Sequence, residues 1–313
     1  MKVLITGAAG FIGSHLSKTL LTSGYRVIGI DNFLLNYDRK MKERNLNLII
    51  SNKNFSFYER SLLDRGWDNG LDFDCVVHLA ALPGVRQSWG DVFSDYIENN
   101  ILATQRLLEV VKQRGGIRLI HISSSSVYGD RDELPLTEDL SPEPISPYAI
   151  TKEAAERLVF LYSKQFGIDY VILRLFTVYG PRQRPDMAIY KFIEKIEKGE
   201  KVEIYNKDNM YRDFTFIDDI VQGILLALES SITSEIVNLG SGKQVSVEEV
   251  VRIISEILGG DLEIVRGDRM PGDVIRTLAG IDKANRLLGY TPSVEIKEGI
   301  EKQIFWMREM SII

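Results

Sequence analysis

The chain has 313 residues, enough for one large domain or two smaller ones around a substantial core. Lys and Arg number 38 against 44 Asp and Glu, for a net charge of -6 and no basic tract, so no nucleic-acid-binding surface is expected. The chain starts directly with a strand-like segment and no apolar stretch reaches the roughly 20 residues that cross a bilayer, so we expect no signal peptide and no membrane contact. Its single cysteine, Cys75, cannot form an internal disulfide, which favours a reducing, cytoplasmic location.

A glycine-rich turn follows the first predicted strand. The strand Lys2–Thr6 leads into Gly7–Gly13, and a predicted helix, Phe11–Ser23, starts within this turn. In the pattern G-x-x-G-x-x-G the first glycine makes the tight turn, the second lets the backbone approach a pyrophosphate, and the third lets the helix pack on the strand. The pyrophosphate would lie at the positive end of the helix. The alternative is a strand–turn–helix that needs its glycines only for packing.

An acidic residue closes the second predicted strand, Arg26–Ile30. Asp31 can accept both hydroxyls of an adenosine ribose, and its charge would repel a 2′-phosphate. The pattern therefore predicts NAD rather than NADP as the cofactor.

Strands and helices then alternate along the chain. The further predicted strands are Phe55–Tyr58, Cys75–Leu79, Arg118–Ser123 and Tyr170–Leu175, and the predicted helices are Ser94–Arg114 and Pro147–Phe166. Several strands are continuous apolar runs, as expected for a parallel sheet covered on both faces. This rhythm predicts an α/β fold with a doubly wound parallel sheet of the Rossmann type.

The rhythm changes after Gly180, where a loop, Pro181–Pro185, precedes less regular elements. We interpret the second part as a smaller, discontinuous α/β substrate-binding domain. The segments Phe214–Leu228 and Ile236–Leu239 are predicted to return to the main sheet as a helix and a strand. The expected domains are therefore 1–177 plus about 214–240 for the dinucleotide, and about 178–213 plus 241–313 for the substrate.

Tyr148 and Lys152 stand four residues apart at the start of the predicted helix Pro147–Phe166, and therefore on one helix face. A phenol has a pKa near 10 and is a poor base unless a nearby cation lowers that value, which Lys152 and a positive nicotinamide ring can do. Ser123–Ser126 follow a strand at its carboxyl end, where ligand contacts collect in such sheets. The alternative is an exposed helix with a chance Tyr and Lys, next to a serine-rich turn.

At these residues the chain resembles the extended short-chain dehydrogenase/reductase family, and within it the NAD-dependent nucleotide-sugar epimerases and dehydratases. The resemblance covers essentially the whole chain, and its segments are Gly7–Gly13, His78–Ala81, Asn99-Asn100, Ser123–Gly129, Tyr148 with Lys152, Arg174–Thr177 and Arg212–Phe214. It implies that Ser124 relays a proton, that Tyr148 is the base and that Lys152 activates it. It also implies a homodimer, through a four-helix interface built from Ser94–Arg114 and Pro147–Phe166.

The resemblance implies two sets of binding residues. Those of the NAD site are Gly7, Gly10, Phe11, Ile12, Gly13, Asp31, Asn32, Ser61, Leu62, Leu79, Ala80, Ala81, Asn99, Tyr148, Lys152 and Phe176. Those of the UDP-sugar site are Pro83, Val85, Arg86, Ser124, Ser125, Ser126, Thr177, Arg184, Met187, Arg212 and Arg269. Arg212 and Arg269 are expected on the UDP phosphates, and the alternative for each arginine is a surface ion pair. The family pattern has Asp where Ser61 stands, and Gly-Asp-Gly where Asn206–Asn209 precede Arg212.

The residues after Ser124 indicate which reaction is expected. Family dehydratases carry an Asp-Glu pair before the Val-Tyr-Gly segment and UDP-glucuronate decarboxylases carry Glu, whereas this chain has Ser125 and Ser126. Without an acid there, elimination of water lacks its proton carrier. Oxidation at C4 followed by reduction from the other face remains, which is 4-epimerisation.

The substrate is expected to be a uronic acid. Gly84–Trp89 and Thr177–Ala188 resemble the corresponding segments of the UDP-glucuronate 4-epimerases, and UDP-glucose 4-epimerases usually have Asn where Thr177 stands. The serines and Thr177 offer hydroxyl donors for a carboxylate. A UDP-glucose/UDP-galactose 4-epimerase is the closest alternative, and a non-catalytic NAD-binding protein is the alternative from another class. His15, His78 and His121 lack ligand spacing, so no metal is expected.

Overall fold

The computed structural model describes residues 1–205, 209–260 and 262–313. Asn206, Lys207 and Asp208, part of the segment that departs from the family pattern before Arg212, lie outside the described residues. Within the described residues, none of the helices is both long and apolar enough to cross a membrane.

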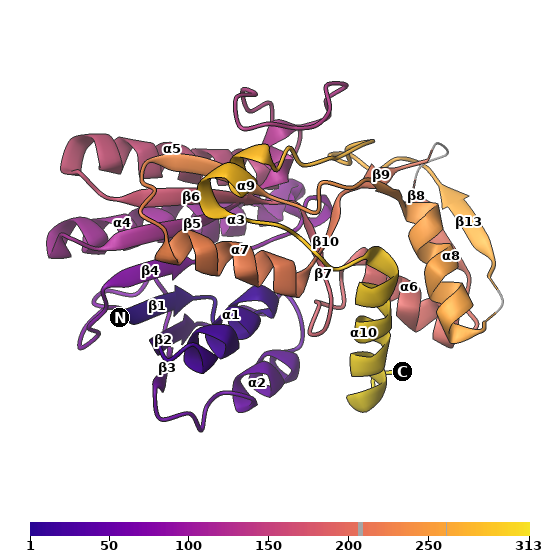
Figure 1. Ribbon diagram of the computed structural model, residues 1–313, viewed down its shortest axis with the longest axis horizontal. Coiled ribbons are helices and arrows are strands. Elements are labelled where there is room, and N and C mark those ends of the chain that lie inside the picture. Colours follow the sequence, from indigo (N-terminus) through magenta and orange to yellow (C-terminus); the bar gives the residue numbers. More distant parts are fainter. Residues whose placement is uncertain (206–208, 261) are drawn as a thin grey trace.

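A parallel sheet of seven strands forms the centre of the described structure, in the order β11-β6-β5-β4-β1-β2-β3 (Figure 1). The strands are β1 Lys2–Thr6, β2 Arg26–Asp31, β3 Phe55–Glu59, β4 Cys75–His78, β5 Arg118–Ser124, β6 Tyr170–Leu175 and β11 Glu235–Leu239. The chain proceeds outward from β1 to β3, and then restarts beside β1 with β4. The carboxyl ends of β1 and β4 are therefore the switch point where ligands bind in such sheets.

Helices cover both faces of this sheet (Figure 1). The helices α1 Phe11–Thr22, α2 Arg39–Asn47 and α7 Ile217–Glu229 lie on one face, and α3 Phe93–Tyr96, α4 Ala103–Arg114 and α5 Pro147–Phe166 lie on the other. Within β1, Val3 and Ile5 belong to the core under α1 and α7, whereas Leu4 belongs to the core under α4 and α5. The continuous apolar strands of the sequence follow from this burial on two sides.

A smaller α/β region lies beyond the carboxyl ends of the strands, on the right of Figure 1. It contains the parallel pair β8 Val202–Tyr205 and β13 Ile264–Gly267, with α6 Ala188–Glu197 and α8 Val247–Leu258 packed together. The remaining elements are β7 Thr177–Tyr179 paired with β10 Phe214–Phe216, β9 Tyr211–Arg212 paired with β12 Val245–Ser246, α9 Asp282–Leu288 and α10 Ile296–Glu309.

The α/β class and the parallel sheet are confirmed, and three details of the prediction were wrong. The predicted helix Ser94–Arg114 is α3 and α4 joined by a π-helical segment, Ile97–Leu102. The predicted helix Phe214–Leu228 begins only at Ile217, because Phe214–Phe216 pair with β7.

The third error is α2, which was not predicted. Its sequence, RKMKERNLN, is polar and lacks an apolar stripe, so no helical period stands out. Asp38 caps it by accepting a hydrogen bond from the Lys40 backbone N–H at 2.9 Å. The packing of Lys42, Asn45 and Leu46 against the rest of the protein supplies the buried face.

Candidate active site

A cavity of about 470 Å³ opens at the switch point between β1 and β4 and extends to the smaller region. All the residues expected at the NAD site line it, as do the residues expected at the sugar site except Arg86 and Arg269. Segments far apart in the sequence meet here because the carboxyl ends of parallel strands share one edge of the sheet.

The glycine turn can hold a pyrophosphate. Gly7 has φ +74°, a conformation that L side chains rarely adopt. A Cβ on Gly13 would lie 2.1 Å from the Gly7 carbonyl oxygen, so the close approach of α1 to the turn requires glycine. Gly10 precedes the first residue of α1, so free N–H groups at the start of this helix face the cavity.

Asp31 lies at the end of β2 with its carboxylate already oriented. Its oxygens accept hydrogen bonds from the Ala9 N–H at 3.1 Å and the Phe33 N–H at 2.8 Å. Burial raises the pKa of Asp31, and the neighbouring Lys42 ammonium opposes that rise. Lys42 is itself buried, lines the cavity and donates to the Leu34 carbonyl at 2.7 Å. The site therefore fits an adenosine ribose, with the Asp31 carboxylate free to accept further hydrogen bonds.

The other residues expected at the cofactor line the dinucleotide half of the cavity as well. Leu62 and Phe176 are buried, Asn99 is half-buried in the π-helical segment, and Asn32 is exposed. Leu79, Ala80 and Ala81 follow β4 directly, and the Ala80 N–H donates to Thr6 Oγ1 at 3.1 Å.

Tyr148 lies in the first turn of α5, whose cap is Ser146 and whose first residue is Pro147. Desolvation raises the pKa of the half-buried Tyr148 phenol above its usual value, and a hydrogen bond with Ser124 and the charge of Arg184 oppose this rise only in part. Ser124 Oγ also accepts a hydrogen bond from Ser126 Oγ at 2.9 Å. Ser124 and Tyr148 thus form a hydroxyl pair that can pass a proton to or from a ligand in the cavity.

Lys152 lies one turn further along α5 and is buried. Its Nζ donates to the Ile122 carbonyl at 2.6 Å. Burial lowers the pKa of Lys152 to about 8, and the Glu156 carboxylate opposes this shift. A buried cation therefore lines the cavity from the same helix as Tyr148, one turn further along.

Ser125, Ser126 and Thr177 add hydroxyls to the same wall of the cavity. Ser125 and Ser126 belong to a single 3₁₀ turn, Ser125–Tyr128, and Thr177 begins β7. Positions 125 and 126 carry no carboxylate, so no acid of the chain stands directly after Ser124.

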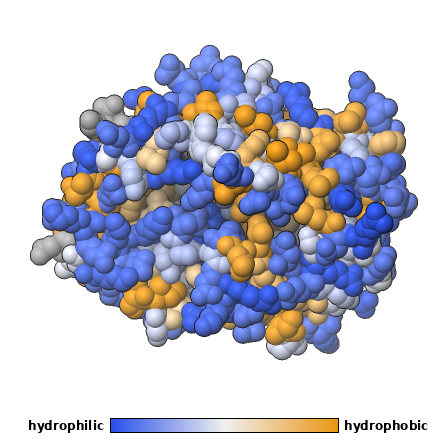
Figure 2. Space-filling model, turned by 180° about the vertical axis from the view of Figure 1, so that it is seen from behind, coloured by the Kyte–Doolittle hydropathy of each residue, from blue (hydrophilic) through white to orange (hydrophobic). Residues whose placement is uncertain are grey.

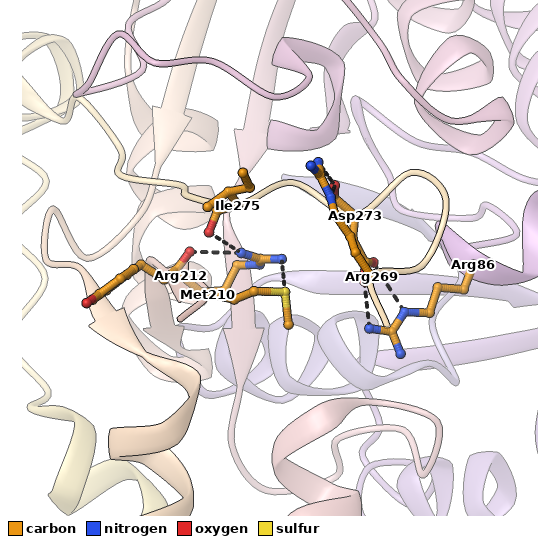
Figure 3. Close-up of polar contacts among 7 residues, drawn as sticks. Arg86, Met210, Arg212, Arg269, Asp273 and Ile275 are labelled. Atoms are coloured by element: carbon orange, nitrogen blue, oxygen red, sulfur yellow. Dashed lines mark hydrogen bonds and ion pairs between the residues drawn. The ribbon is translucent and has the colours of Figure 1, made fainter. Parts of the chain in front are cut away.

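Arg86, Arg212 and Arg269 lie near Asp273, and only Arg212 among them lines the cavity (Figure 3). Arg212 lines it and donates to the carbonyls of Tyr211 at 2.9 Å and Ile275 at 3.2 Å. Burial lowers the pKa of Arg212 to about 10. In the part of the chain that the structure describes its hydrogen-bond acceptors are neutral, so an anion in the cavity would add a direct charged partner.

Arg86 and Arg269 lie outside the cavity lining and contact Asp273 instead (Figure 3). Arg86 Nη2 donates to the Asp273 carboxylate at 2.8 Å, and Arg269 Nε donates to the Asp273 carbonyl at 3.1 Å. Arg269 also pairs with Asp130. The structure therefore places these two guanidinium groups on Asp273 rather than in the cavity lining.

The remaining residues expected at the sugar lie in two loops. Pro83 and Val85 line the cavity, and Tyr96 Oη donates to the Pro83 carbonyl at 3.1 Å. Arg184 and Met187 line it from the loop before α6, and Arg184 is paired with Asp186 at 2.8 Å.

Sequence reasoning missed Tyr37, Lys42 and Asp273, which also line the cavity. The phenol oxygen of Tyr37 is buried without a hydrogen-bond partner, and the Lys42 ammonium lies 4.8 Å from the centre of its ring. No spacing signal marks Tyr37 or Lys42, because they belong to the polar segment around α2. The described residues contain no group of three or more His, Cys, Asp or Glu side chains that could hold a metal ion.

Residues 3–240 match the family described as the NAD dependent epimerase/dehydratase family. The chain belongs to this family. It is 41% identical to a protein of Bacillus subtilis named an uncharacterized UDP-glucose epimerase, over 99% of each chain. It is 37% identical to the UDP-glucuronate 4-epimerase of Thermodesulfobacterium geofontis, over 98% of this chain and 96% of that one.

A solved structure has the same fold over the full length. The crystal structure of UDP-glucuronic acid 4-epimerase from Bacillus cereus, in complex with UDP-glucuronic acid and NAD, superimposes with a TM-score of 0.96. The identity is 42%, over 99% of this chain and 100% of that one. The expected family, its fold and its NAD dependence are thereby confirmed.

Proposed function

We propose that this protein is an isomerase that interconverts UDP-glucuronate and UDP-galacturonate by NAD-dependent epimerisation at C4. The Ser124–Tyr148 hydroxyl pair carries the proposal, because it lines a cavity together with Ser125, Ser126 and Thr177, and positions 125 and 126 carry no acid. This arrangement supports proton transfer at a sugar hydroxyl and hydrogen bonding to a carboxylate. It offers no acid beside Ser124 for elimination of water.

In the proposed site the dinucleotide lies along the glycine turn and Asp31, and the UDP-sugar reaches from Tyr148 to Arg212. NAD, when bound, would supply the hydride acceptor and donor at C4. Tyr148, as phenolate, takes the proton of the C4 hydroxyl directly or through Ser124, and returns it after the 4-keto sugar has turned over. Lys152 stabilises the phenolate electrostatically.

Arg212 is proposed to bind the diphosphate, because it lines the cavity and its hydrogen-bond acceptors among the described residues are all neutral. Binding through the UDP part leaves the sugar free to turn over between its two orientations. Arg86, Arg184 and Arg269 are proposed to support the diphosphate end or the carboxylate; in this structure all three are paired with acidic residues.

A uronic acid needs protection during this reaction. Oxidation at C4 makes a β-keto acid, which loses CO₂ when its carboxylate stands perpendicular to the carbonyl plane. We propose that Ser125, Ser126 and Thr177 hold the carboxylate away from that geometry. All three line the cavity next to Ser124.

The proposal includes the expected division into a dinucleotide part, 1–177 with 214–240, and a UDP-sugar part, 178–213 with 241–313. It also includes a homodimer in the cytoplasm. Four large apolar side chains on the π-helical segment Ile97–Leu102 and on α5 are between 39% and 52% exposed. They are Ile97, Leu102, Ile150 and Leu161. Apolar side chains gather in the upper right of Figure 2, where α4 and α5 lie in that view. Light scattering of the purified protein tests this, and a monomer at all concentrations would contradict it.

The deciding experiment incubates the purified protein, without added NAD, with UDP-glucuronate and UDP-glucose in parallel. Chromatography that resolves the C4 epimers reads the products. UDP-galacturonate from the first substrate and little product from the second is the expected result, with the cofactor retained from expression. Turnover of UDP-glucose alone would favour the second candidate, to which the name of the Bacillus subtilis relative points. Tight NAD without turnover of either sugar would favour a non-catalytic protein.

A further inference from the structure

The loop Pro181–Asp186 joins β7 to α6 and is bound to α1. His15 Nε2 lies 2.9 Å from the Pro181 carbonyl oxygen, and Arg182 Nη1 donates to Ser14 Oγ at 3.2 Å. Arg182 has φ +65° and is 8% exposed. A non-glycine residue in this conformation persists where surrounding contacts hold it. Two neighbouring residues of α1 therefore supply contacts that fix the start of the loop.

The rest of the loop is held from the other side. Gln183 Oε1 accepts hydrogen bonds from the Tyr190 N–H at 3.1 Å and from Gln303 Nε2 at 2.8 Å. Gln303 Oε1 accepts a hydrogen bond from the Gly180 N–H at 3.0 Å. The loop is therefore held by α1 at Pro181 and Arg182 and by Gln303 and Tyr190 at the buried Gln183, directly before Arg184.

The loop also connects α1 with the cavity. Arg184 and Tyr148 both line the cavity, whereas Ser14 is buried and does not line it. The His15 ring packs edge-on against Phe11, with ring centroids 5.9 Å apart, and Phe11 lines the dinucleotide half. The helix that begins at the glycine turn is thus joined to the loop that carries Arg184.

We propose that Ser14 and His15 position Arg184 by holding the Pro181–Asp186 loop on α1. The helix of the dinucleotide half would then set where the Arg184 guanidinium lies relative to Tyr148. The inference rests on the proposed function for the role of Tyr148. Ser14, His15 and Arg182 do not line the cavity, so they are positioning residues.

The effect would be electrostatic. The groups that face Tyr148 are the Arg184 guanidinium, the Ser124 hydroxyl and the ring of Tyr96, with Lys152 on its own helix. The charge of Arg184 lowers the pKa of the Tyr148 phenol. If the loop moves away from α1, this lowering weakens and the pKa of Tyr148 rises.

His15 acts in this arrangement as an uncharged hydrogen-bond donor. Burial and the neighbouring charges of Arg182 and Lys18 lower the pKa of His15 to about 3, although the Pro181 carbonyl raises it. Near neutral pH the neutral ring donates from Nε2 to this carbonyl. A glutamine can replace that donation and a phenylalanine cannot.

The test titrates Tyr148 through the ultraviolet absorbance of its phenolate, in the full chain as purified. Each protein is compared with the same protein carrying Tyr148→Phe, so that the difference reports this tyrosine alone. His15→Phe is expected to raise the pKa of Tyr148 by about half a unit, from a displacement of Arg184 by a few ångströms. His15→Gln and Lys18→Ala, a change at an exposed position of α1, should leave it unchanged.

An unchanged pKa of Tyr148 in His15→Phe, or an equal rise in Lys18→Ala, would overturn the proposal. Ser14→Ala removes the acceptor of Arg182 and decides the question if His15→Phe does not fold. The acid limb of the pH profile of kcat should shift with the phenolate titration. If the parent converts no UDP-sugar, the proposed function fails, and the titration still tests the positioning. If the parent is active, and neither the pKa of Tyr148 nor the acid limb of the kcat profile shifts in the variants, only the positioning role of Ser14 and His15 fails.

Discussion

Glu156 and Arg174 form a bidentate ion pair in the interior of the protein. Arg174 Nε donates to Glu156 Oε1 at 3.0 Å and Arg174 Nη2 donates to Oε2 at 2.7 Å, with both side chains 2% exposed. Ser123 also donates to Glu156, and Lys152 lies one turn before Glu156 on α5. The pair therefore fixes β5, β6 and α5 beneath the candidate active site.

Glu156→Gln should destabilise the protein strongly. Removing one partner of a buried ion pair leaves the other charge uncompensated, which lowers the free energy of unfolding by about 3–5 kcal/mol. Urea denaturation measures the loss. Glu263→Gln is the matched control, because its partner Lys201 and Glu263 are both more than half exposed and the expected effect is at most about 1 kcal/mol. A loss of equal size in both variants would contradict this role of the pair.

Tyr148→Phe should abolish most turnover without preventing binding. Loss of a general base typically lowers kcat by about 10²–10⁴-fold, and the phenyl ring still fills the place of the phenol. Calorimetry with the UDP-sugar should give a dissociation constant close to that of the parent. If kcat falls by less than tenfold, another group takes the C4 proton.

Thr177→Val should lower the activity on UDP-glucuronate more than any activity on the neutral UDP-glucose. The change keeps the shape and removes one hydroxyl, and a hydrogen bond to a charged group contributes about 1.5–3 kcal/mol. The value of kcat/KM for UDP-glucuronate should fall roughly 10–100-fold, with a UDP-pentose or 4-keto-pentose by-product. Any activity on UDP-glucose is the internal control. Unimpaired epimerisation without by-product, in Thr177→Val and in Ser126→Ala, would refute the proposed carboxylate site.

Arg212→Lys should weaken binding of the UDP part. A lysine keeps the charge but loses the planar donor fork, so we expect KM for the UDP-sugar to rise roughly 10-fold or more with a smaller change in kcat. Arg86→Lys is the comparison, since the Arg86 guanidinium is paired with Asp273 outside the cavity lining. Equal increases in KM would mean that Arg86 leaves Asp273 to contact the substrate.

The buried histidines should make the protein less stable in acid. Burial lowers the pKa of His78 to about 3 and that of His121 well below its usual value. The unfolded chain binds protons at these residues below about pH 6.5 and the folded chain does not, so the free energy of unfolding falls as the pH drops. Each histidine contributes about 1.4 kcal/mol per pH unit.

His121→Leu tests this dependence. Both ring nitrogens of His121 are buried without a hydrogen-bond partner, so the substitution removes the titrating group and breaks no hydrogen bond. Urea denaturation at pH 7.5 and 5.5 should show a smaller loss of stability in His121→Leu than in the parent. An identical loss in both proteins would show that His121 is protonated in the folded state.

Local sequence determined much of the fold and the core of the site. Gly7–Gly13 between a strand and a helix, and Tyr148 with Lys152 at one helical turn, depend on backbone conformation and helix periodicity, which neighbouring residues set. The continuous apolar strands likewise predicted a sheet covered on both faces. Helix α2 escaped prediction because tertiary packing, rather than an apolar period, buries Lys42 and Asn45.

Only the tertiary structure decided which charges face the cavity. From the sequence, Arg212 and Arg269 are expected on the UDP phosphates, and Arg86 and Arg184 are further candidates for the substrate. In the folded chain Asp273 and Asp130 pair with Arg86 and Arg269 across long sequence separations, whereas the acceptors of Arg212 among residues 1–205, 209–260 and 262–313 are neutral. The free energy of a buried charge depends on its partners in space. Spacing along the chain therefore predicts where a helix or a turn forms, but not where a guanidinium group finds its counter-charge.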